Sequence, residues 1–185
     1  MRFRSCFSWL KIRRARQGTW LVRKIEHPTA WRDGTFDPSA MKEAFADGHD
    51  DISVYEVASD IEEADVAAAI WVVRGAPKDP IHLLRIPVED MQTVSLQVVH
   101  SHGETGLDRI DSAHRDIKGD SERFAALGQK LVARSCDGRD IVRTVSGRGL
   151  SQRLADFLES GIIAEDRTQG AIRALAKSDL RWPRQ

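Results

Sequence analysis

Three histidines in the middle of the chain come nearest, by type and spacing, to metal chemistry. His100 and His102 are two positions apart, and His114 follows after a stretch that contains Asp108 and Asp111. Residues at i and i+2 of a strand project to one face, so a third ligand from His114 would complete an open catalytic metal site. However, the run HSHG has no second paired motif of the HExxH or CxxC kind. We therefore predict no metal site and interpret these histidines as solvated or capping residues.

The run SGRGLS, residues 146–151, has the composition of an anion-binding turn. Gly147 and Gly149 let backbone N–H groups turn towards a ligand, and Arg148 between them is a bidentate donor. A helix that starts here would add positive potential for a phosphate or carboxylate. The run is neither a Walker A loop nor a dinucleotide-binding fingerprint. An anion site and a plain connecting turn remain as alternative interpretations.

Covalent catalysis has little support in the sequence. Cys136 precedes Asp137 and Gly138, which is typical of a turn after a helix and provides no group that would activate the thiol. Ser53 has no base next to it in the sequence, and the chain has no GxSxG motif. A nucleophile would need a base brought to it by the fold.

Trp31 is a further candidate for ligand contact. It lies in a polar stretch beside Arg32 and Asp33. Such a tryptophan, with one apolar and one polar edge, suits a ligand platform or a lid. We therefore expect an exposed Trp31 that contributes to ligand binding.

The elements that must position these residues are a mixture of strands and helices. Alternating or β-branched runs predict strands at residues 19–26, 52–57, 81–86, 93–100, 114–118 and 140–145. Capping patterns predict helices at residues 38–47, 60–70, 121–133, 151–160 and 166–177, with a turn at 87–91 and a loop at 101–112. The spacing lacks the regular β-α-β alternation of a doubly wound sheet. We therefore predict an α+β fold in which a mixed, mostly antiparallel sheet packs against about four to five helices.

Length and composition fit one soluble domain. The 185 residues include 41% hydrophobic residues, and 28 Lys+Arg balance 28 Asp+Glu. A chain of this length can bury a core without disulfide or metal staples. The longest clean apolar run, residues 66–73, is too short to span a membrane. The two distant cysteines, Cys6 and Cys136, fit a reducing compartment, so we expect a cytoplasmic protein.

The balanced net charge hides two segregated segments. Residues 1–24 carry eight Lys/Arg and no acid, whereas residues 43–65 carry nine acids and no Lys or Arg. We interpret residues 1–18 as a basic, poorly ordered extension and residues 19–185 as the domain. Contact of the arm, residues 1–24, with nucleic acid or an anionic membrane is the alternative that we do not favour. The acidic segment is the predicted docking surface for a basic protein partner.

The order of LVRKI, AWRDGTFDPSAMKEAF, ISVYE and DSAHRDIKG resembles a group of small bacterial proteins. Their pattern has an arginine-bearing first strand, a Gly-Ser-Ala-Phe segment, an Ile-Ser-Val strand and a His-x-x-Ile-x-Gly element. The resemblance implies no particular activity, but it implies a shared cleft. The positions that it marks are Arg23, Trp31, Ser53, His114 and Gly119.

An arginine on the first strand before a serine-bearing strand is also similar to mono-ADP-ribosyltransferase-like enzymes, which hold NAD in this way. That resemblance implies a catalytic glutamate, and Glu56 is available at a position that no motif requires.

Two function hypotheses follow. The first is a small cytoplasmic, bacterial-type binding or interaction protein without chemistry or cofactor of its own. The alternative is an enzyme acting on a nucleotide or other phosphate-bearing substrate, with Arg23, Ser53 and His114 as catalytic candidates and the 146–150 turn as anion holder. Convergence of these residues on one cleft with a perturbed histidine would favour the enzyme. Among the histidines, we expect His114 to be the site residue.

Overall fold

The computed structural model describes residues 19–32, 37–45, 51–73 and 80–163. The predicted basic extension, residues 1–18, and the predicted helix at residues 166–177 lie outside these ranges. The elements in chain order are β1 Trp20–Ile25, α1 Pro28–Arg32, α2 Pro38–Phe45, β2 Asp51–Val57, α3 Asp60–Val73, β3 Ile81–Pro87, α4 Val88–Thr93, β4 Gln97–His100, α5 Asp108–Asp111, β5 His114–Lys118, α6 Ser121–Cys136, β6 Val142–Val145 and α7 Gly147–Glu159.

One antiparallel sheet organises the fold. Its strand order is β4-β5-β2-β1-β3-β6, and every neighbouring pair is antiparallel. The described part of the chain contains seven helices, of which α1, α4 and α5 have six residues or fewer. The predicted α+β class with a mostly antiparallel sheet is confirmed. No helix among the described residues is long and apolar enough to cross a membrane.

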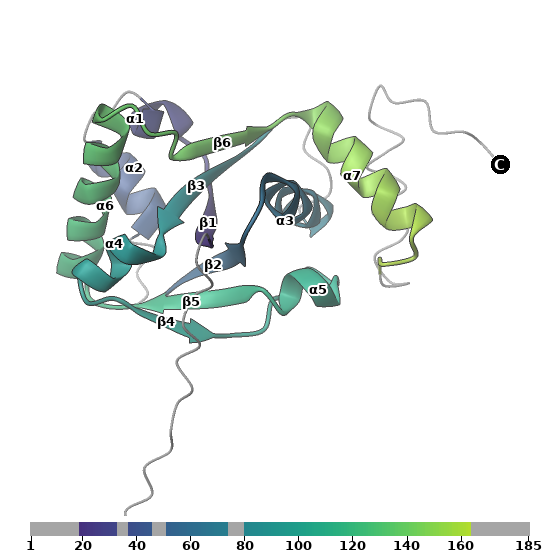
Figure 1. The fold of residues 1–185 in the computed structure, drawn as a ribbon, viewed down its shortest axis with the longest axis horizontal. Helices are drawn as coiled ribbons and strands as arrows, with labels where there is room; N and C mark the ends of the chain where they lie inside the picture. The colour runs from purple at the N-terminus through teal and green to yellow at the C-terminus, as the bar shows by residue number, and fades with distance from the viewer. Residues whose placement is uncertain (1–18, 33–36, 46–50, 74–79, 164–185) are drawn as a thin grey trace, which may run out of the picture.

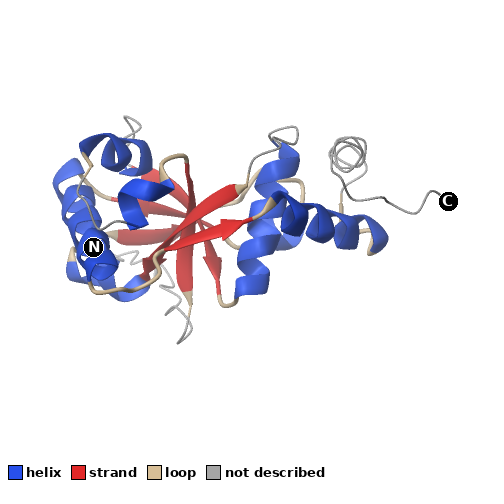
Figure 2. Cartoon of the chain, turned by 90° about the horizontal axis from the view of Figure 1, so that it is seen from above, coloured by secondary structure: helices blue, strands red, loops and turns tan. Residues whose placement is uncertain are grey.

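Helices cover both faces of the sheet (Figures 1 and 2). On one face, α3 and α7 pack over β1, β3 and β6 around a core that includes Val22, Leu83 and Leu154. On the other face, α1, α2, α4 and α6 enclose a second core around Trp31 and Leu127. Successive side chains of a strand point to opposite faces of the sheet. Two adjacent apolar residues on one strand, such as Leu83 and Leu84 of β3, therefore contribute one side chain to each core.

The predicted helix caps are present. Asp37 Oδ1 accepts a hydrogen bond from the backbone N–H of Ser39 at 2.8 Å, at the start of α2. At the start of α3, the Glu62 N–H donates to Ser59 Oγ, and the Glu62 carboxylate accepts from the Ala58 N–H. Each bond satisfies a donor that a helix start leaves without a partner. These local signals fix where the elements begin.

The predicted strand at residues 93–100 is wrong in its first half. The N–H groups of Val94 and Leu96 donate to the Met91 carbonyl and close α4, and Ser95 has a positive φ of 58°. This left-handed residue cannot continue a strand, so β4 contains only Gln97–His100. The predicted loop at 101–112 also contains the short helix α5.

Two buried carboxylates of α3 anchor that helix to its neighbours. Glu63 is fully buried and accepts two hydrogen bonds from Arg85 of β3, at 2.6 and 2.7 Å. Asp65 is 1% exposed and accepts from Arg153 of α7. Buried carboxylates require such partners because desolvation of an unpaired charge is costly. The pairs therefore fix α3 between the sheet and α7.

Candidate functional site

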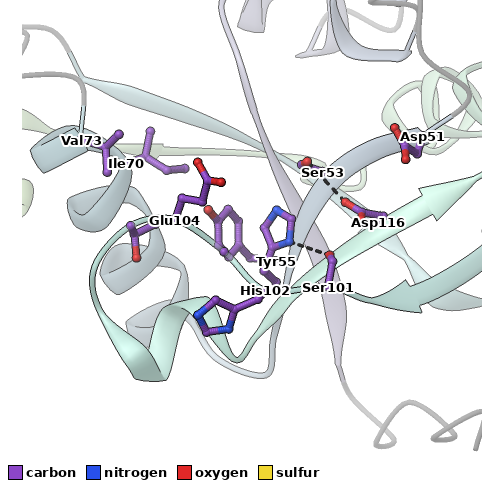
Figure 3. Close-up of a pocket in the computed structure, with 12 residues that line it drawn as sticks. Asp51, Ser53, Tyr55, Ile70, Val73, Ser101, His102, Glu104 and Asp116 are labelled. Atoms are coloured by element: carbon purple, nitrogen blue, oxygen red, sulfur yellow. Dashed lines mark hydrogen bonds between the residues drawn. The ribbon is translucent and has the colours of Figure 1, made fainter.

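A pocket of about 520 Å³ opens on the sheet face that carries α3, beyond the part that this helix covers (Figure 3). Its floor comes from β2 and β5, one wall from the C-terminal end of α3, and the other wall from residues 101–105. The side chains or backbone of twelve described residues line it: Asp51, Ser53, Tyr55, Ile70, Val73, Ser101, His102, Gly103, Glu104, Thr105, His114 and Asp116. Two of the predicted catalytic candidates, Ser53 and His114, are thus brought to one pocket.

His114 lines the pocket and contacts Ser101 and Tyr55 there. A hydrogen bond of 2.7 Å joins its Nδ1 to Ser101 Oγ, and its ring meets the Tyr55 ring edge-on with centroids 5.0 Å apart. Burial lowers the pKa of His114 below its ordinary value, although Asp116 and Asp111 act in the opposite direction. The imidazole is therefore favoured in its neutral form, which can accept a proton.

Tyr55 is the aromatic part of the pocket floor. Burial, with a smaller contribution from Asp111, raises its pKa to about 12. The phenol therefore keeps its proton at neutral pH. Tyr55 and His114 are direct neighbours in the register of β2 and β5.

Ser53 and Asp116 form the neighbouring pair in this register. The Ser53 hydroxyl donates to Asp116 Oδ1 over 3.4 Å, which is a long hydrogen bond. Arg23 also contacts Ser53, because its Nη1 donates to the Ser53 backbone carbonyl at 3.0 Å. On β1, however, Arg23 shares the face of Leu21 and Ile25 and is not among the pocket-lining residues. The structure thus joins Ser53 and His114 in one pocket and leaves Arg23 outside it.

Asp111 shapes the wall formed by residues 101–105. It is 3% exposed and accepts hydrogen bonds from the N–H and hydroxyl of Thr105 and from the N–H of Gly106. The Gly103 N–H donates to the Asp111 carbonyl, and a Cβ at Gly103 would lie 2.6 Å from Asp111 Oδ1. This close approach requires glycine at position 103. The wall is therefore held by a single carboxylate beneath it.

The described lining carries negative charge without a compensating cation. Apart from the Tyr55 phenol, its ionisable groups are three carboxylates, Asp51, Glu104 and Asp116, together with two histidines, and it includes no Lys or Arg. Lys118 is not a lining residue, but it is the register partner of Asp51, a cross-strand position at which opposite charges attract. Glu104 and Asp116 are thus the two acids that face the pocket without a cationic register partner.

The three candidate metal ligands do not form a site. His102 and His114 line the pocket, but His100 is the register partner of Arg115, which points to the opposite face of β5 from His114. Within the described ranges, no group of three His, Cys, Asp or Glu residues is placed to hold a metal ion.

The predicted anion turn lies away from the pocket. Gly147, Arg148 and Gly149 form the first turn of α7, and Ser146 caps this helix by accepting from the Gly149 N–H. Arg148 is exposed. The structure contains no test of anion binding here, so this site stays a prediction.

The expectation of an exposed Trp31 is wrong. Trp31 belongs to α1, is 1% exposed and meets the Phe45 ring edge-on in the second core. The polar residues next to Trp31 in the sequence do not determine its exposure, because α1 directs the Trp31 side chain into the core and the Arg32 side chain to the surface. Trp31 is a core residue and cannot serve as a surface platform.

The other marked positions have structural partners. Glu56 forms an ion pair with Arg115 at 2.7 Å, on the face of β2 opposite to Ser53 and Tyr55. A Cβ at Gly119 would lie 2.2 Å from Leu96 Cδ2, so Gly119 packs closely against that side chain. Neither residue lines the pocket.

The acidic segment does not form one continuous surface in its described part. Glu63 and Asp65 are buried against arginines, Glu56 pairs with Arg115, and Asp51 lies at the pocket. The docking of a basic protein partner on this segment is not tested by the structure and stays a prediction.

Sequence reasoning missed several polar pocket residues, among them Tyr55, Ser101, Glu104 and Asp116. A signal existed for two of them. Tyr55 is two positions from Ser53 and Asp116 two from His114, so each shares a strand face with its candidate. Ser101 and Glu104 lie in the loop that Asp111 organises, and nothing local predicts its path.

Comparisons with known proteins give no relative for this chain: no protein-family model matches it, and neither curated proteins nor solved structures show significant similarity. The functional argument therefore depends on the pocket itself.

Proposed function

We propose that this protein is a binding protein that takes a small organic cation in the pocket between β2, β5, the end of α3 and residues 101–105. One observation carries the proposal: the described lining has three carboxylates and no Lys or Arg. A negative, partly enclosed site favours a positive ligand through charge complementarity. The Tyr55 ring offers an additional surface on which a cation can bind.

The same observation weighs against a phosphate-bearing substrate in this pocket. A phosphate would lie among Asp51, Glu104 and Asp116 without an arginine or lysine from the described lining. Like charges in such a site repel the ligand. The 146–150 turn remains the candidate for anions, at a separate place.

The test of this function varies ligand charge at constant size. Isothermal titration of the protein with 1-aminobutane, butan-1-ol and butyrate compares a cation, a neutral molecule and an anion. We expect the amine to bind tightest and its affinity to fall as salt is raised. If the alcohol or the carboxylate binds as tightly as the amine, the proposal is wrong.

A substitution locates the binding. Asp116→Asn should weaken 1-aminobutane about fivefold, since an accessible ion pair contributes up to roughly 1 kcal/mol. Glu159→Gln, an exposed carboxylate at the end of α7, is the matched control and should leave affinity unchanged. Equal affinities of the Asp116→Asn variant and the parent would place the ammonium group away from Asp116.

A second candidate function, catalysis by a serine nucleophile, is favoured by one contact. Ser101 Oγ and His114 Nδ1 are 2.7 Å apart, and the lowered pKa of His114 keeps the imidazole available as a base. A fluorophosphonate probe should then label Ser101, and His114→Ala should abolish the labelling. Absence of a label on the folded parent protein would reject this candidate.

The proposed location is the cytoplasm. The chain has only two cysteines, Cys6 and Cys136, far apart in the sequence, which suits a reducing compartment. Fractionation of cells that express the protein would test it, and recovery from a secreted or periplasmic fraction would contradict it.

A further inference from the structure

We propose that the ligand of this pocket is an extended dication, with one cationic group at each end and an apolar chain between them. This inference deepens the proposed function and rests on it. It depends on where the two pocket acids Glu104 and Asp116 lie relative to the uncharged middle of the pocket.

The strand register gives the pocket a direction. Ser53 and Tyr55 lie on one face of β2, opposite Asp116 and His114 of β5 in the same order. Two residues along a strand advance roughly 7 Å. Asp116 therefore lies one such step before the Tyr55 and His114 pair.

Glu104 lies at the other side of this pair. Figure 3 shows Asp51, Ser53 and Asp116 at one end of the pocket and Glu104 with Ile70 and Val73 at the other, with Tyr55 between them. The loop held by Asp111 sets the position of Glu104. The two acids are thus separated along the pocket and do not form one cluster, in agreement with the absence of a metal-binding group among the described residues.

The middle of the pocket is uncharged at neutral pH. Tyr55 keeps its phenolic proton, and burial favours neutral His114. Towards the Glu104 end, Ile70 and Val73 of α3 add aliphatic surface. An aliphatic chain would bury apolar area against these groups, which favours binding in proportion to that area.

A ligand with a single charge satisfies only half of this arrangement. An ammonium group beside Asp116 leaves the Glu104 carboxylate without a partner, and one beside Glu104 leaves Asp116. A dication pairs with both acids while its chain covers the uncharged middle. The two pairs belong to one molecule, so the second forms without a further loss of translational freedom.

The experiment compares 1,4-diaminobutane with two ligands of similar length, 1-aminobutane and 4-aminobutan-1-ol. The alcohol keeps hydrogen bonding at the second end but has no charge there. Isothermal titration at constant ionic strength should show the diamine binding at least about fivefold tighter than either, as expected for one added ion pair. Glu104→Gln should remove this advantage, whereas Glu159→Gln should preserve it.

The outcomes separate this inference from the proposed function. Equal affinities of all three amines for the parent protein would overturn the dication and leave a binding site for a single cation. Binding of none of them would overturn both proposals. A diamine advantage that survives in Glu104→Gln would also overturn the inference, because the second charge would then pair elsewhere. Thermal melts of each variant confirm that it is folded.

Discussion

Carboxylates occupy two contrasting regions on the same side of the sheet. Glu63 and Asp65 of α3, which we call the structural carboxylates, are at most 1% exposed and bound by arginines. Glu104 and Asp116, the pocket carboxylates, face a cavity whose described lining has no Lys or Arg. The first pair has its counter-charge inside the protein. The second pair has no Lys or Arg beside it in the described lining, so a cationic ligand would supply its counter-charge.

This difference shows why residue type alone does not identify a site. The partners of the structural carboxylates come from far along the chain, since Arg85 lies 22 residues from Glu63 and Arg153 lies 88 residues from Asp65. A run of acids in the sequence therefore predicted a docking surface, whereas the fold uses two of them internally. Removal of a carboxylate should thus lower stability in the first region and ligand affinity in the second.

The largest effect is expected for Glu63→Ala. This change leaves Arg85 without its main hydrogen-bond acceptor, and Arg85 is only 21% exposed. Breaking a buried ion pair from one side costs about 3 to 5 kcal/mol of unfolding free energy. Urea unfolding followed by circular dichroism measures it, and Glu159→Ala is the exposed control. A loss below about 1 kcal/mol would show that Glu63 is not structural.

Asp111→Asn should have the next largest effect on stability. It should also lower ligand affinity, because Asp111 is a buried carboxylate that holds a wall of the pocket. The amide keeps one oxygen, and its NH₂ group lies opposite a backbone donor: the Gly106 N–H if the oxygen faces Thr105, or the Thr105 N–H if the oxygen faces Gly106. One unsatisfied buried donor costs roughly 1 to 3 kcal/mol. The wall of the pocket should shift as well, so 1-aminobutane affinity should fall. Loss of stability with unchanged amine affinity would show that the pocket does not depend on this wall.

Much of the fold was predictable because its signals are local. The caps at Asp37, Ser59 and Asp120 and the alternation in β2 and β3 all identify elements that the structure contains. The errors arise where a tertiary contact or a single backbone angle decides. Ser95 ends the expected strand through its positive φ, and Trp31 is buried by α2 and α6 packing over α1.

The site was predictable in part. Of the five positions that the resemblance marks for a shared cleft, only Ser53 and His114 line the pocket, since their strands are neighbours in the sheet. The order β5-β2-β1 could not be derived from the sequence, so neither could the pairing of Ser53 with Asp116 or the exclusion of Arg23. Ser101 and Glu104 depend on the buried Asp111, whose three side-chain bonds are tertiary features of one loop.

A smaller effect is expected from His114 on the pH dependence of stability. Burial lowers its folded-state pKa below the ordinary 6.5, so the unfolded chain binds the proton more readily. Stability should therefore fall as pH drops through about 6.5, and level off below the folded pKa. His82, whose pKa is also lowered by burial, acts in the same direction.

Urea unfolding at about pH 8 and about pH 5 separates the two histidines. His114→Gln should reduce the loss of stability between these values, and the His82→Gln, His114→Gln double variant should reduce it further. An unchanged pH dependence in the double variant would show that neither histidine is held neutral by the fold.

The smallest effect on stability is expected for substitutions of the pocket carboxylates. A nearly unchanged unfolding free energy there is the sharpest test of the difference between the pocket carboxylates and the structural carboxylates. Asp116→Asn removes only a 3.4 Å hydrogen bond from Ser53, and Glu104 is exposed. Each change should alter unfolding free energy by less than about 0.5 kcal/mol, as is usual for surface positions. If either costs as much as Glu63→Ala, that carboxylate is structural too, because only a group with a partner inside the protein stabilises the fold when no ligand is bound.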